Sequence, residues 1–371
     1  MQSPANPRAE GPESAQPKVR AGAGLERPEG AQSPAEGRAA AAPAGVLVQL
    51  RGLKTYFQTG RSVVRAVDGV DLVIRRNRTL GVVGESGCGK SVMALSILGL
   101  IPQPPAKVTG EILYYREDGT AVDLAKLNPM GKAIRKIRGK EIAMVFQEPM
   151  TSLNPVYTIG TQIVEAIRLH QKVSAAEAKR RAVEMLRMVG IPAPEQRASE
   201  YPHQMSGGMR QRAMIAMALS CNPKLLICDE PTTALDVTIQ AQILDLLRNI
   251  QEETRTAIVM ISHDLGVIAS IADEVAVMYL GQIVEYGSVR QVFKDRLHPY
   301  TQGLFHSIPR LGRKGKERLE PIRGMVPDPR NVPSGCRFAD RCPHRMAVCD
   351  EPPPLFQAAP GHFSRCWLHG P

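Results

Sequence analysis

The stretch Gly84-Glu-Ser-Gly-Cys-Gly-Lys-Ser91 constrains the fold of this chain more than any other feature. It satisfies the pattern G-x4-G-K-[ST], in which glycines let consecutive backbone N–H groups converge on phosphate oxygens. The apolar run TLGVV precedes it, and SVMALSILGL with helical periodicity follows, so the predicted order is strand, loop, helix. A helix that starts at such a loop adds the partial positive charge of its N-terminus. The stretch therefore predicts an α/β fold that holds a polyphosphate.

Every residue of this loop is a candidate ligand contact. Lys90 can reach the β and γ oxygens of a nucleotide, and Ser91 carries a hydroxyl that suits Mg²⁺. The remaining candidates line the loop with backbone N–H groups; they are Gly84, Glu85, Ser86, Gly87, Cys88 and Gly89.

Other short apolar runs predict the strands of the same domain. VLVQL from Val46 and VDLVI around residue 72 suit strands. KLLICDE at 224–230 and AIVMIS at 257–262 lack alternation, as strands buried on both faces do, and the segment between them has helical periodicity. Strands and helices that alternate in this way predict a parallel sheet.

Two adjacent acids end the run at 224–230. Asp229 is placed to be the second anchor of Mg²⁺. Glu230 would face the γ-phosphate, where a carboxylate can orient or deprotonate the attacking water. The pair predicts that the bound nucleotide is hydrolysed.

Composition divides the chain into three parts. Residues 1–44 are rich in Ala, Pro, Gly and charge and contain no aromatic residue, which predicts a disordered tail. Residues 45–290 hold the strand and helix signals. Within them the segment of about 151–221 predicts a helical insertion, with Ser174 and Glu177 as a capping box and Gly190 as a stop. Residues 291–371 predict a small, loop-rich extension with four cysteines.

Net charge, hydropathy and cysteine content restrict the possible partners and the cellular compartment of the protein. The net charge of +11 permits an acidic partner, but Lys and Arg are scattered, which indicates an ordinary basic surface. No apolar run approaches the roughly 20 residues that a membrane span needs, and the N-terminus lacks the apolar region of a secretory signal. The seven cysteines are odd in number, which argues against a disulfide framework.

Four further motifs carry a family resemblance: VFQEP at 145–149, MSGGM at 205–209, PTTALD at 231–236 and ISHD at 261–264. Together with the phosphate loop they resemble an ABC-type ATPase, in the order Walker A, Q-loop, signature, Walker B, D-loop and H-loop. The resemblance covers about residues 46 to 290. It implies a RecA-like P-loop NTPase cassette of the ABC type, in which 151–221 would be the helical subdomain.

The resemblance also implies roles for single residues. His263 would contact the γ-phosphate and Glu230, Gln147 would sense Mg²⁺ and the attacking water, and Phe57, with Tyr56 as the alternative, would stack on adenine. Two cassettes of this family pair head to tail. The signature motif of one cassette would therefore cover the ATP bound to the other cassette. The free N–H groups at the N-terminus of a helix favour this contact, because they bind phosphate oxygens. The residues that would act across the dimer are Ser206, Gly207, Gly208 and Asp236.

Two stretches narrow the branch. FQEPMTSLNP at 146–155 and HPYTQGLFHSIP at 298–309 resemble the ATPases of oligopeptide and dipeptide importers. This implies ATP-driven peptide uptake, on the cytoplasmic face of the cell (inner) membrane. The implied partners are two multi-pass permease subunits, a second ABC ATPase in a heterodimer and, indirectly, an extracytoplasmic binding protein. Nickel complexes or haem remain alternative cargoes. Met150, Leu153 and Pro155 would contact a permease helix.

The cysteines of the extension have the spacing C-x5-C-x6-C-x16-C and are Cys336, Cys342, Cys349 and Cys366. A metal site would stabilise a segment with little core. Zinc prefers C-x2-C pairs, whereas iron–sulfur clusters accept varied spacing. The tail resembles that of importer ATPases reported to carry a 4Fe-4S cluster, so a cluster is the prediction, with zinc and free thiols as alternatives.

Two other classes of function compete with transport. A soluble ABC ATPase that acts on DNA or ribosomes would suit the charge, but such proteins carry two cassettes, a coiled-coil insert or an internal zinc module, and this chain has no heptad repeat. A binding-only regulator would have lost catalytic residues. Because Lys90, Gln147, Asp229, Glu230 and His263 are present, we predict hydrolysis. Because the chain shows one cassette and none of the features of the soluble class, we expect no nucleic-acid partner.

Overall fold

The computed structural model describes residues 43–233, 235–307 and 322–370. The predicted disorder of residues 1–44 lies outside the described residues, apart from the last two of them. The described residues form one compact unit.

The centre of the fold is an eight-stranded sheet with the order β11-β12-β10-β9-β3-β8-β7-β6. The strands are β3 (Thr79–Val83), β6 (Ile142–Val145), β7 (Leu225–Asp229), β8 (Ala257–Ile261), β9 (Glu274–Tyr279), β10 (Gln282–Ser288), β11 (Phe356–Ala359) and β12 (His362–Ser364). The strands β9, β3, β8, β7 and β6 pair in parallel, and the last three at the other end pair antiparallel. Every residue of β3, β7 and β8 is buried, as the absence of alternation in their sequences predicts.

A second sheet, of four antiparallel strands, has the order β2-β1-β4-β5. Its strands are β1 (Val46–Thr59), β2 (Ser62–Arg75), β4 (Ala106–Tyr115) and β5 (Ala121–Asp123). The strands predicted from VLVQL and VDLVI exist, but they belong to this sheet and not to the parallel one. Their partly alternating burial shows the physical reason, because one face of the sheet packs on the core and the other is largely open.

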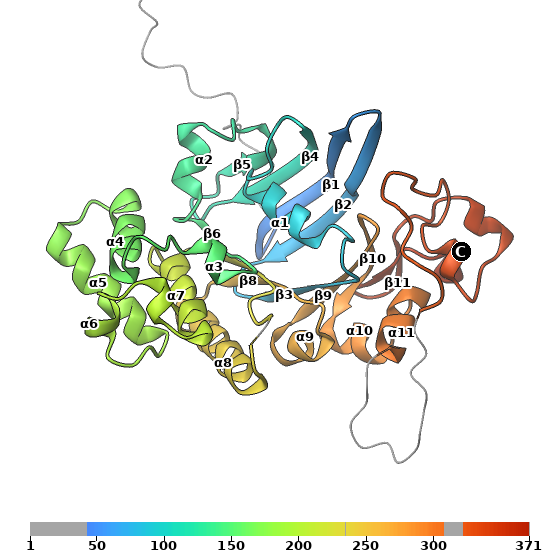
Figure 1. Cartoon of the computed structure of the whole chain (residues 1–371). Helices are drawn as coiled ribbons and strands as arrows, with labels where there is room; N and C mark the ends of the chain where they lie inside the picture. Colours follow the sequence, from blue (N-terminus) through green and yellow to red (C-terminus); the bar gives the residue numbers. More distant parts are fainter. Residues whose placement is uncertain (1–42, 234, 308–321, 371) are drawn as a thin grey trace, which may run out of the picture. The chain divides into compact units, whose positions relative to one another are not determined.

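The helices of the described residues are α1 (Lys90–Ile97), α2 (Lys132–Ile137), α3 (Pro149–Ser152), α4 (Ile159–His170), α5 (Ala175–Met188), α6 (Pro194–Arg197), α7 (Gly207–Leu219), α8 (Val237–Thr254), α9 (Leu265–Ile271), α10 (Val289–Lys294) and α11 (Pro299–His306). Short 3₁₀ turns lie at Leu124–Lys126, Pro202–Gln204, Ala339–Arg341, Ala347–Asp350 and Trp367–His369. Figure 1 shows α4 to α7 grouped beside β6, at one end of the central sheet.

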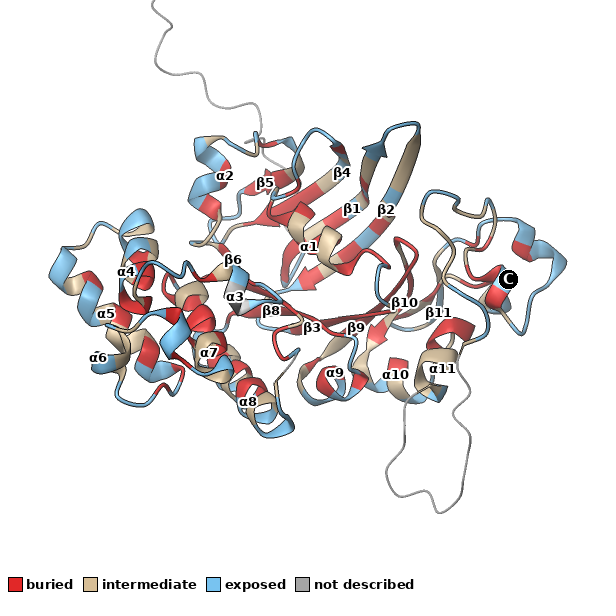
Figure 2. Cartoon of the chain, viewed as in Figure 1, coloured by how far each residue is buried: buried red, intermediate tan, exposed pale blue. Residues whose placement is uncertain are grey.

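The central sheet separates two hydrophobic cores. One core lies between this sheet, α1, α2 and the four-stranded sheet, and the other lies between the central sheet and helices on its opposite side, among them α4, α5, α7, α8 and α9. Figure 2 shows the resulting continuous buried layer along the central strands. A loop at the carboxyl ends of β3 and β7 is therefore mounted on strands that cannot move independently.

Helix α5 illustrates a cap that the sequence predicts only in part. Ser174 caps it, because the Glu177 N–H donates to the Ser174 hydroxyl at 3.2 Å. Glu177 does not return a hydrogen bond to the cap. Its carboxylate pairs instead with Arg180 and Arg181 at 2.8 Å and 2.6 Å, so the two arginines outcompete the capping box.

Candidate nucleotide-binding site

The phosphate loop joins β3 to α1 and is shaped by two glycines. At Gly84 (φ 153°) an added Cβ would lie 2.1 Å from the Met278 carbonyl oxygen. At Gly89 (φ 104°) it would lie 2.1 Å from the Ala66 carbonyl oxygen. The loop therefore passes closer to the neighbouring backbone than any side chain allows, and its N–H groups are left at the carboxyl edge of the sheet.

Lys90 and Ser91 begin α1 and are held by the loop and by β7. The buried Lys90 ammonium donates to the carbonyl oxygens of Gly84 and Glu85 at 2.8 Å and 3.0 Å. The Ser91 hydroxyl donates to Asp229 Oδ1 at 3.0 Å. One hydroxyl and one carboxylate thus meet next to the phosphate loop, and this is the donor set that Mg²⁺ prefers beside a nucleotide.

Burial is the main cause that raises the pKa of Asp229 above its ordinary value; the neighbouring Glu230 raises it further, while Ser91 and Lys90 oppose the shift. The folded carboxyl group binds its proton more tightly than the unfolded one. Folding is therefore favoured as pH falls through this raised pKa, and the gain is complete below the ordinary pKa of about 4. At neutral pH the ionised carboxylate costs stability, which a bound cation would offset.

Asp229→Asn tests this trade between stability and binding. We expect the melting temperature of the nucleotide-free protein to rise by about 1–3 °C, because the buried charge is gone, while Mg²⁺-dependent ATP binding is lost. Thermal melts with and without Mg²⁺-ATP measure both effects. A lower melting temperature in the absence of ligand would contradict the assigned cost of the charge.

Glu230 follows β7 and is the centre of a polar cluster. Its carboxylate Oε2 accepts from Gln147 Nε2 at 3.1 Å and from the Thr233 hydroxyl at 3.0 Å, and it lies 3.2 Å from His263 Nδ1. The residue has φ 48°, a conformation that costs energy for a side chain other than glycine. The fold maintains this strain, with the effect that one carboxylate meets groups from three separate loops.

A cavity of about 530 Å³ lies over this cluster. Its walls include Ser86, Gly87, Gly89, Lys90 and Ser91 from the loop and α1, and Gln147, Glu230 and His263 from the facing loops. Eight of the residues predicted from sequence therefore share one cavity. Asp229 is buried beneath it, where it accepts the Ser91 hydrogen bond.

Other predicted residues do not line this cavity. Phe57 is half-buried on β1 and is absent from its walls, and the alternative, Tyr56, directs its hydroxyl to Asp68. Ser206 caps α7 through the Met209 N–H at 3.3 Å, with Gly207 and Gly208 in its first turn. Asp236 caps α8 by accepting from Thr238 and Ile239, both at 3.0 Å.

The two methionines of the MSGGM motif have a structural explanation. Met205 is only 3% exposed in the hydrophobic core, and Met209 packs against the same core. Both apolar side chains anchor the start of α7, so Ser206 and Gly207 remain exposed between them. The difference from a polar last residue therefore leaves the exposed part of the motif unchanged.

The sequence did not point to three residues near the loop. Ala66 and Thr233 line the cavity, and Tyr300 accepts a hydrogen bond from the Glu85 N–H at 2.8 Å. Thr233 belongs to PTTALD, so that motif could have revealed it. Nothing in the local sequence connects Ala66 or Tyr300 with a loop that lies far away in the chain.

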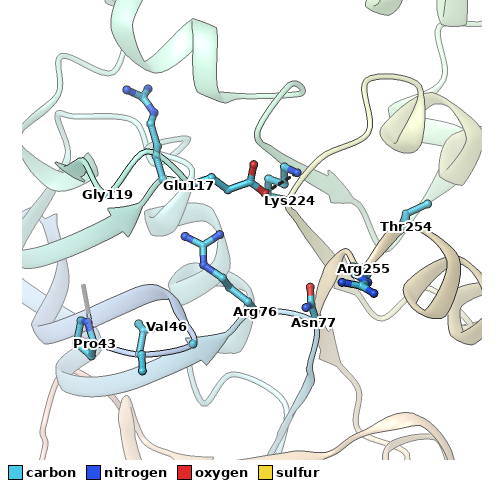
Figure 3. Close-up of a pocket in the computed structure, with 12 residues that line it drawn as sticks. Pro43, Val46, Arg76, Asn77, Glu117, Gly119, Lys224, Thr254 and Arg255 are labelled. Atoms are coloured by element: carbon cyan, nitrogen blue, oxygen red, sulfur yellow. Dashed lines mark ion pairs between the residues drawn. The ribbon is translucent and has the colours of Figure 1, made fainter. Parts of the chain in front are cut away.

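A second hollow of about 530 Å³ lies elsewhere on the same unit (Figure 3). Its lining includes residues 43–46 and the charged residues Arg76, Glu117, Lys224 and Arg255. Lys224 and Glu117 form an ion pair across it at 2.8 Å. It contains no glycine loop and no carboxylate beside a hydroxyl, so its chemistry does not match the cavity over Glu230.

A third, mostly apolar groove of about 280 Å³ lies next to the Q-loop, with Leu100, Met144, Phe146, Leu169 and Met217 among its walls. Leu169 is 76% exposed. Leu153, which was expected to contact a permease, is buried at 3% exposure and packs in the core, so that expectation is wrong. Pro155 is exposed, and the side chain of Met150 lies outside the described residues.

The four cysteines of the extension lie in one region. Cys336, Cys349 and Cys366 are buried, and Cys342 is half-buried. The pKa of Cys366 is raised to about 11, mainly by burial and to a smaller extent by the neighbouring Cys336, Cys342 and Cys349. The described residues hold no group of three or more His, Cys, Asp or Glu side chains arranged around a single ion.

The phosphate loop, the hydrogen-bonded pair of Ser91 and Asp229, and the Glu230 carboxylate lie together at the carboxyl ends of parallel strands, and this arrangement defines a P-loop NTPase. Residues 67–233 match the family described as ABC transporter, and residues 284–349 match the oligopeptide/dipeptide transporter C-terminal region. An oligopeptide transport ATP-binding protein of Bacillus subtilis is 50% identical over 88% of this chain and 89% of its own. The dipeptide transport ATP-binding protein DppD of the same organism is 49% identical over 87% and 94%.

The chain therefore belongs to the ATP-binding proteins of ABC transporters, in the group with the oligopeptide/dipeptide C-terminal region. Among solved structures, a post-hydrolysis dimer of the ATP-binding cassette MJ0796 with ADP and phosphate matches 66% of this chain and 99% of its own. The identity is 29% and the TM-score 0.58. In the part of the chain that the structure describes, no helix has the length and apolar character that crossing a membrane requires.

Proposed function

We propose that this chain is the ATP-hydrolysing subunit of an importer that carries dipeptides or oligopeptides across the cytoplasmic membrane. The observation that supports hydrolysis is the Glu230 carboxylate, held by Gln147, Thr233 and His263 beside the Ser91–Asp229 pair. Peptide import is supported by the relatives of about 50% identity and by the match of residues 284–349. The protein would work at the cytoplasmic face of the membrane.

Each residue of the site has a proposed role. The loop N–H groups and Lys90 would bind the phosphates. Ser91, Asp229 and Gln147 would hold Mg²⁺, and the ion would supply positive charge that offsets the charge of the phosphates. Glu230 accepts the proton of the attacking water, and His263 orients Glu230. Phe57 remains the proposed adenine contact, although its ring lies outside the cavity walls.

The site is completed by a second cassette. Ser206, Gly207 and Gly208 lie exposed or half-exposed at the start of α7, and Asp236 starts α8. None of them lines the cavity of its own chain. These residues would therefore act on the nucleotide of a partner, and we propose that this partner is a distinct ABC ATPase.

The groove beside the Q-loop is the proposed contact for the permease subunits. Its apolar walls and the exposed Leu169 suit a short amphipathic helix from a membrane protein. Closure of the ATP dimer would shift the groove, because it lies next to Gln147 in sequence and in space. Nucleotide binding would in this way change the state of the membrane pair.

We also propose that Cys336, Cys342, Cys349 and Cys366 hold a 4Fe-4S cluster. The cluster would supply covalent links that stabilise a loop-rich segment. Protein purified without oxygen should be brown, and Cys349→Ser should be colourless with a melting temperature lower by several degrees. Iron and acid-labile sulfide measured in both forms check this. A colourless wild-type protein with bound zinc or with four free thiols would contradict it.

The import function is tested by affinity purification of tagged Glu230→Gln protein with ATP from solubilised membranes. We expect two multi-pass proteins and a second ABC ATPase, and loss of labelled dipeptide uptake in cells that lack the gene. Recovery of ribosomes or DNA without membrane proteins would favour the soluble class of ABC ATPase. Uptake of nickel or haem in place of peptide would change the cargo but not the ATPase.

A further inference from the structure

The C-terminal extension makes direct contact with the phosphate loop through Glu85. The Glu85 N–H donates to the hydroxyl oxygen of Tyr300 at 2.8 Å. Its carboxylate forms a two-point ion pair with Arg341, with N–O distances of 2.7 Å and 3.0 Å. Arg341 is 5% exposed, so solvent screens this pair weakly.

The same residue also supports the lysine of the site. The Glu85 carbonyl oxygen accepts from the Lys90 ammonium at 3.0 Å. Glu85 therefore has its N–H and carboxylate bound by the extension and its carbonyl bound by Lys90. A displacement of Glu85 would be transmitted to the ammonium that we assign to the phosphates.

Aromatic packing holds Tyr300 and Arg341 in place. The rings of Tyr279, Tyr300 and Phe338 lie with centroids 4.6 to 5.5 Å apart, and they come from β9, α11 and the extension. The Arg341 guanidinium lies 5.7 Å and 5.9 Å from the rings of Tyr279 and Phe338. Its Nε also donates to the Arg323 carbonyl at 3.0 Å. The two groups that bind Glu85 are thus fixed before any ligand arrives.

The start of α11 is fixed by buried polar groups. The His298 Nδ1 atom accepts from the Tyr300 N–H at 3.0 Å, and burial lowers the pKa of His298 to about 4, which keeps the ring neutral and able to accept. Glu285 on β10 accepts from the N–H groups of Leu297 and His298 at 3.0 Å and 2.9 Å. The HPY stretch at 298–300 therefore fixes the start of α11, and this holds the Tyr300 hydroxyl where it accepts the hydrogen bond from the Glu85 N–H.

A second set of hydrogen bonds connects the extension with the phosphate loop at Cys88. Arg337 pairs with Asp68 and donates to the Leu280 carbonyl, and the Asp68 N–H donates to the Gly281 carbonyl at 2.8 Å. The Gly281 N–H in turn donates to the Cys88 carbonyl of the phosphate loop at 2.9 Å. The extension thus contacts the loop directly at Glu85 and indirectly at Cys88.

From these contacts we propose that Tyr300 and Arg341 are positioning residues for ATP binding, so that the C-terminal extension forms part of the nucleotide site. A loop that is held in its binding conformation loses less conformational entropy when phosphate arrives, and its affinity is higher. The inference rests on the proposed assignment of residues 84–91 to ATP. It concerns the affinity of the site and not the chemistry at Glu230.

Three substitutions in the full chain test this. Tyr300→Phe removes the acceptor and keeps the ring, Arg341→Lys keeps the charge and loses the two-point pair, and Glu85→Gln neutralises the carboxylate. Each should raise KM for ATP, and Kd measured with Glu230→Gln also present, by roughly tenfold, with kcat changed less than twofold. Arg341→Lys should add little to Glu85→Gln, because both remove the same interaction.

Matched controls separate positioning from general stability. Tyr286→Phe removes the hydroxyl of a tyrosine on β10 and keeps the ring, which packs against Phe363. Arg345→Met removes an exposed arginine that forms ion pairs with Asp340 and Asp350. Neither residue touches the loop, and neither substitution should change KM. An unchanged KM in folded Tyr300→Phe and Arg341→Lys would overturn the inference, as would a fall in kcat at constant KM. Failure of the wild-type chain to bind ATP would overturn the proposed function as well.

Discussion

Replacing Glu230 by Gln should leave ATP binding intact and lower hydrolysis by two to four orders of magnitude. The amide keeps the size of the side chain and can still accept from Gln147 and Thr233, but it cannot take a proton from water. General bases typically contribute factors of this size. Because the substitution neither opens a cavity nor buries a new charge, the melting temperature should stay within a few degrees of the wild type.

Single-turnover hydrolysis and equilibrium binding of Mg²⁺-ATP measure the two properties separately. Glu253→Gln is the control, since it makes the same chemical change at an exposed position on α8. We expect the control to match the wild type in both assays. Turnover of Glu230→Gln at the wild-type rate would assign the base to another residue.

The substitution Gly89→Ala should weaken ATP binding so strongly that the Kd for ATP rises by more than a hundredfold. The new Cβ would lie 2.1 Å from the Ala66 carbonyl oxygen and 2.9 Å from Met278 Cε. Real atoms do not approach so closely, and the Ala66 contact is backbone that cannot rotate away. The loop must therefore move from its place over α1, and its N–H groups lose their common direction.

Gly69→Ala separates this collision from simple backbone strain. Gly69 also has a positive φ, of 79°, but an added Cβ there meets no atom within 4 Å. Both variants bear the cost of about 1–2 kcal/mol for a left-handed alanine, and only Gly89→Ala displaces the loop. Binding measured by calorimetry should be unchanged in Gly69→Ala. Equal losses in both variants would indicate that strain, and not the collision, controls the loop.

Local motifs made much of the site predictable. The phosphate loop, the acids Asp229 and Glu230, and the glutamine and histidine that contact Glu230 each lie in a short stretch whose chemistry is legible by itself. The parallel strands were predictable for a similar reason, because complete burial leaves a continuous apolar run. Their convergence in one cavity follows from the carboxyl ends of parallel strands meeting at one edge.

The rest depends on contacts between distant segments. VLVQL gives no sign that β1 pairs with β4, which lies beyond the phosphate loop in the chain. Arg341 is 256 residues from Glu85, and an arginine in a polar loop looks the same whether it is exposed or buried in an ion pair. Phe57 is a different case, because its assignment to adenine depends on a family pattern alone. Its ring lies on β1, outside the walls of the cavity over Glu230, so the contact stays a prediction.

The hairpin of β11 and β12 has a consequence for solubility. It pairs with β10, at Tyr286 and Phe363, and so covers the backbone hydrogen-bonding groups along that side of the strand. A chain cut before residue 350 would present β10 as an open sheet edge, which readily recruits strands from other molecules. Truncated forms should therefore aggregate during expression. By covering the edge of β10, the hairpin would prevent self-association of the protein, in addition to the proposed role of the extension in ATP binding.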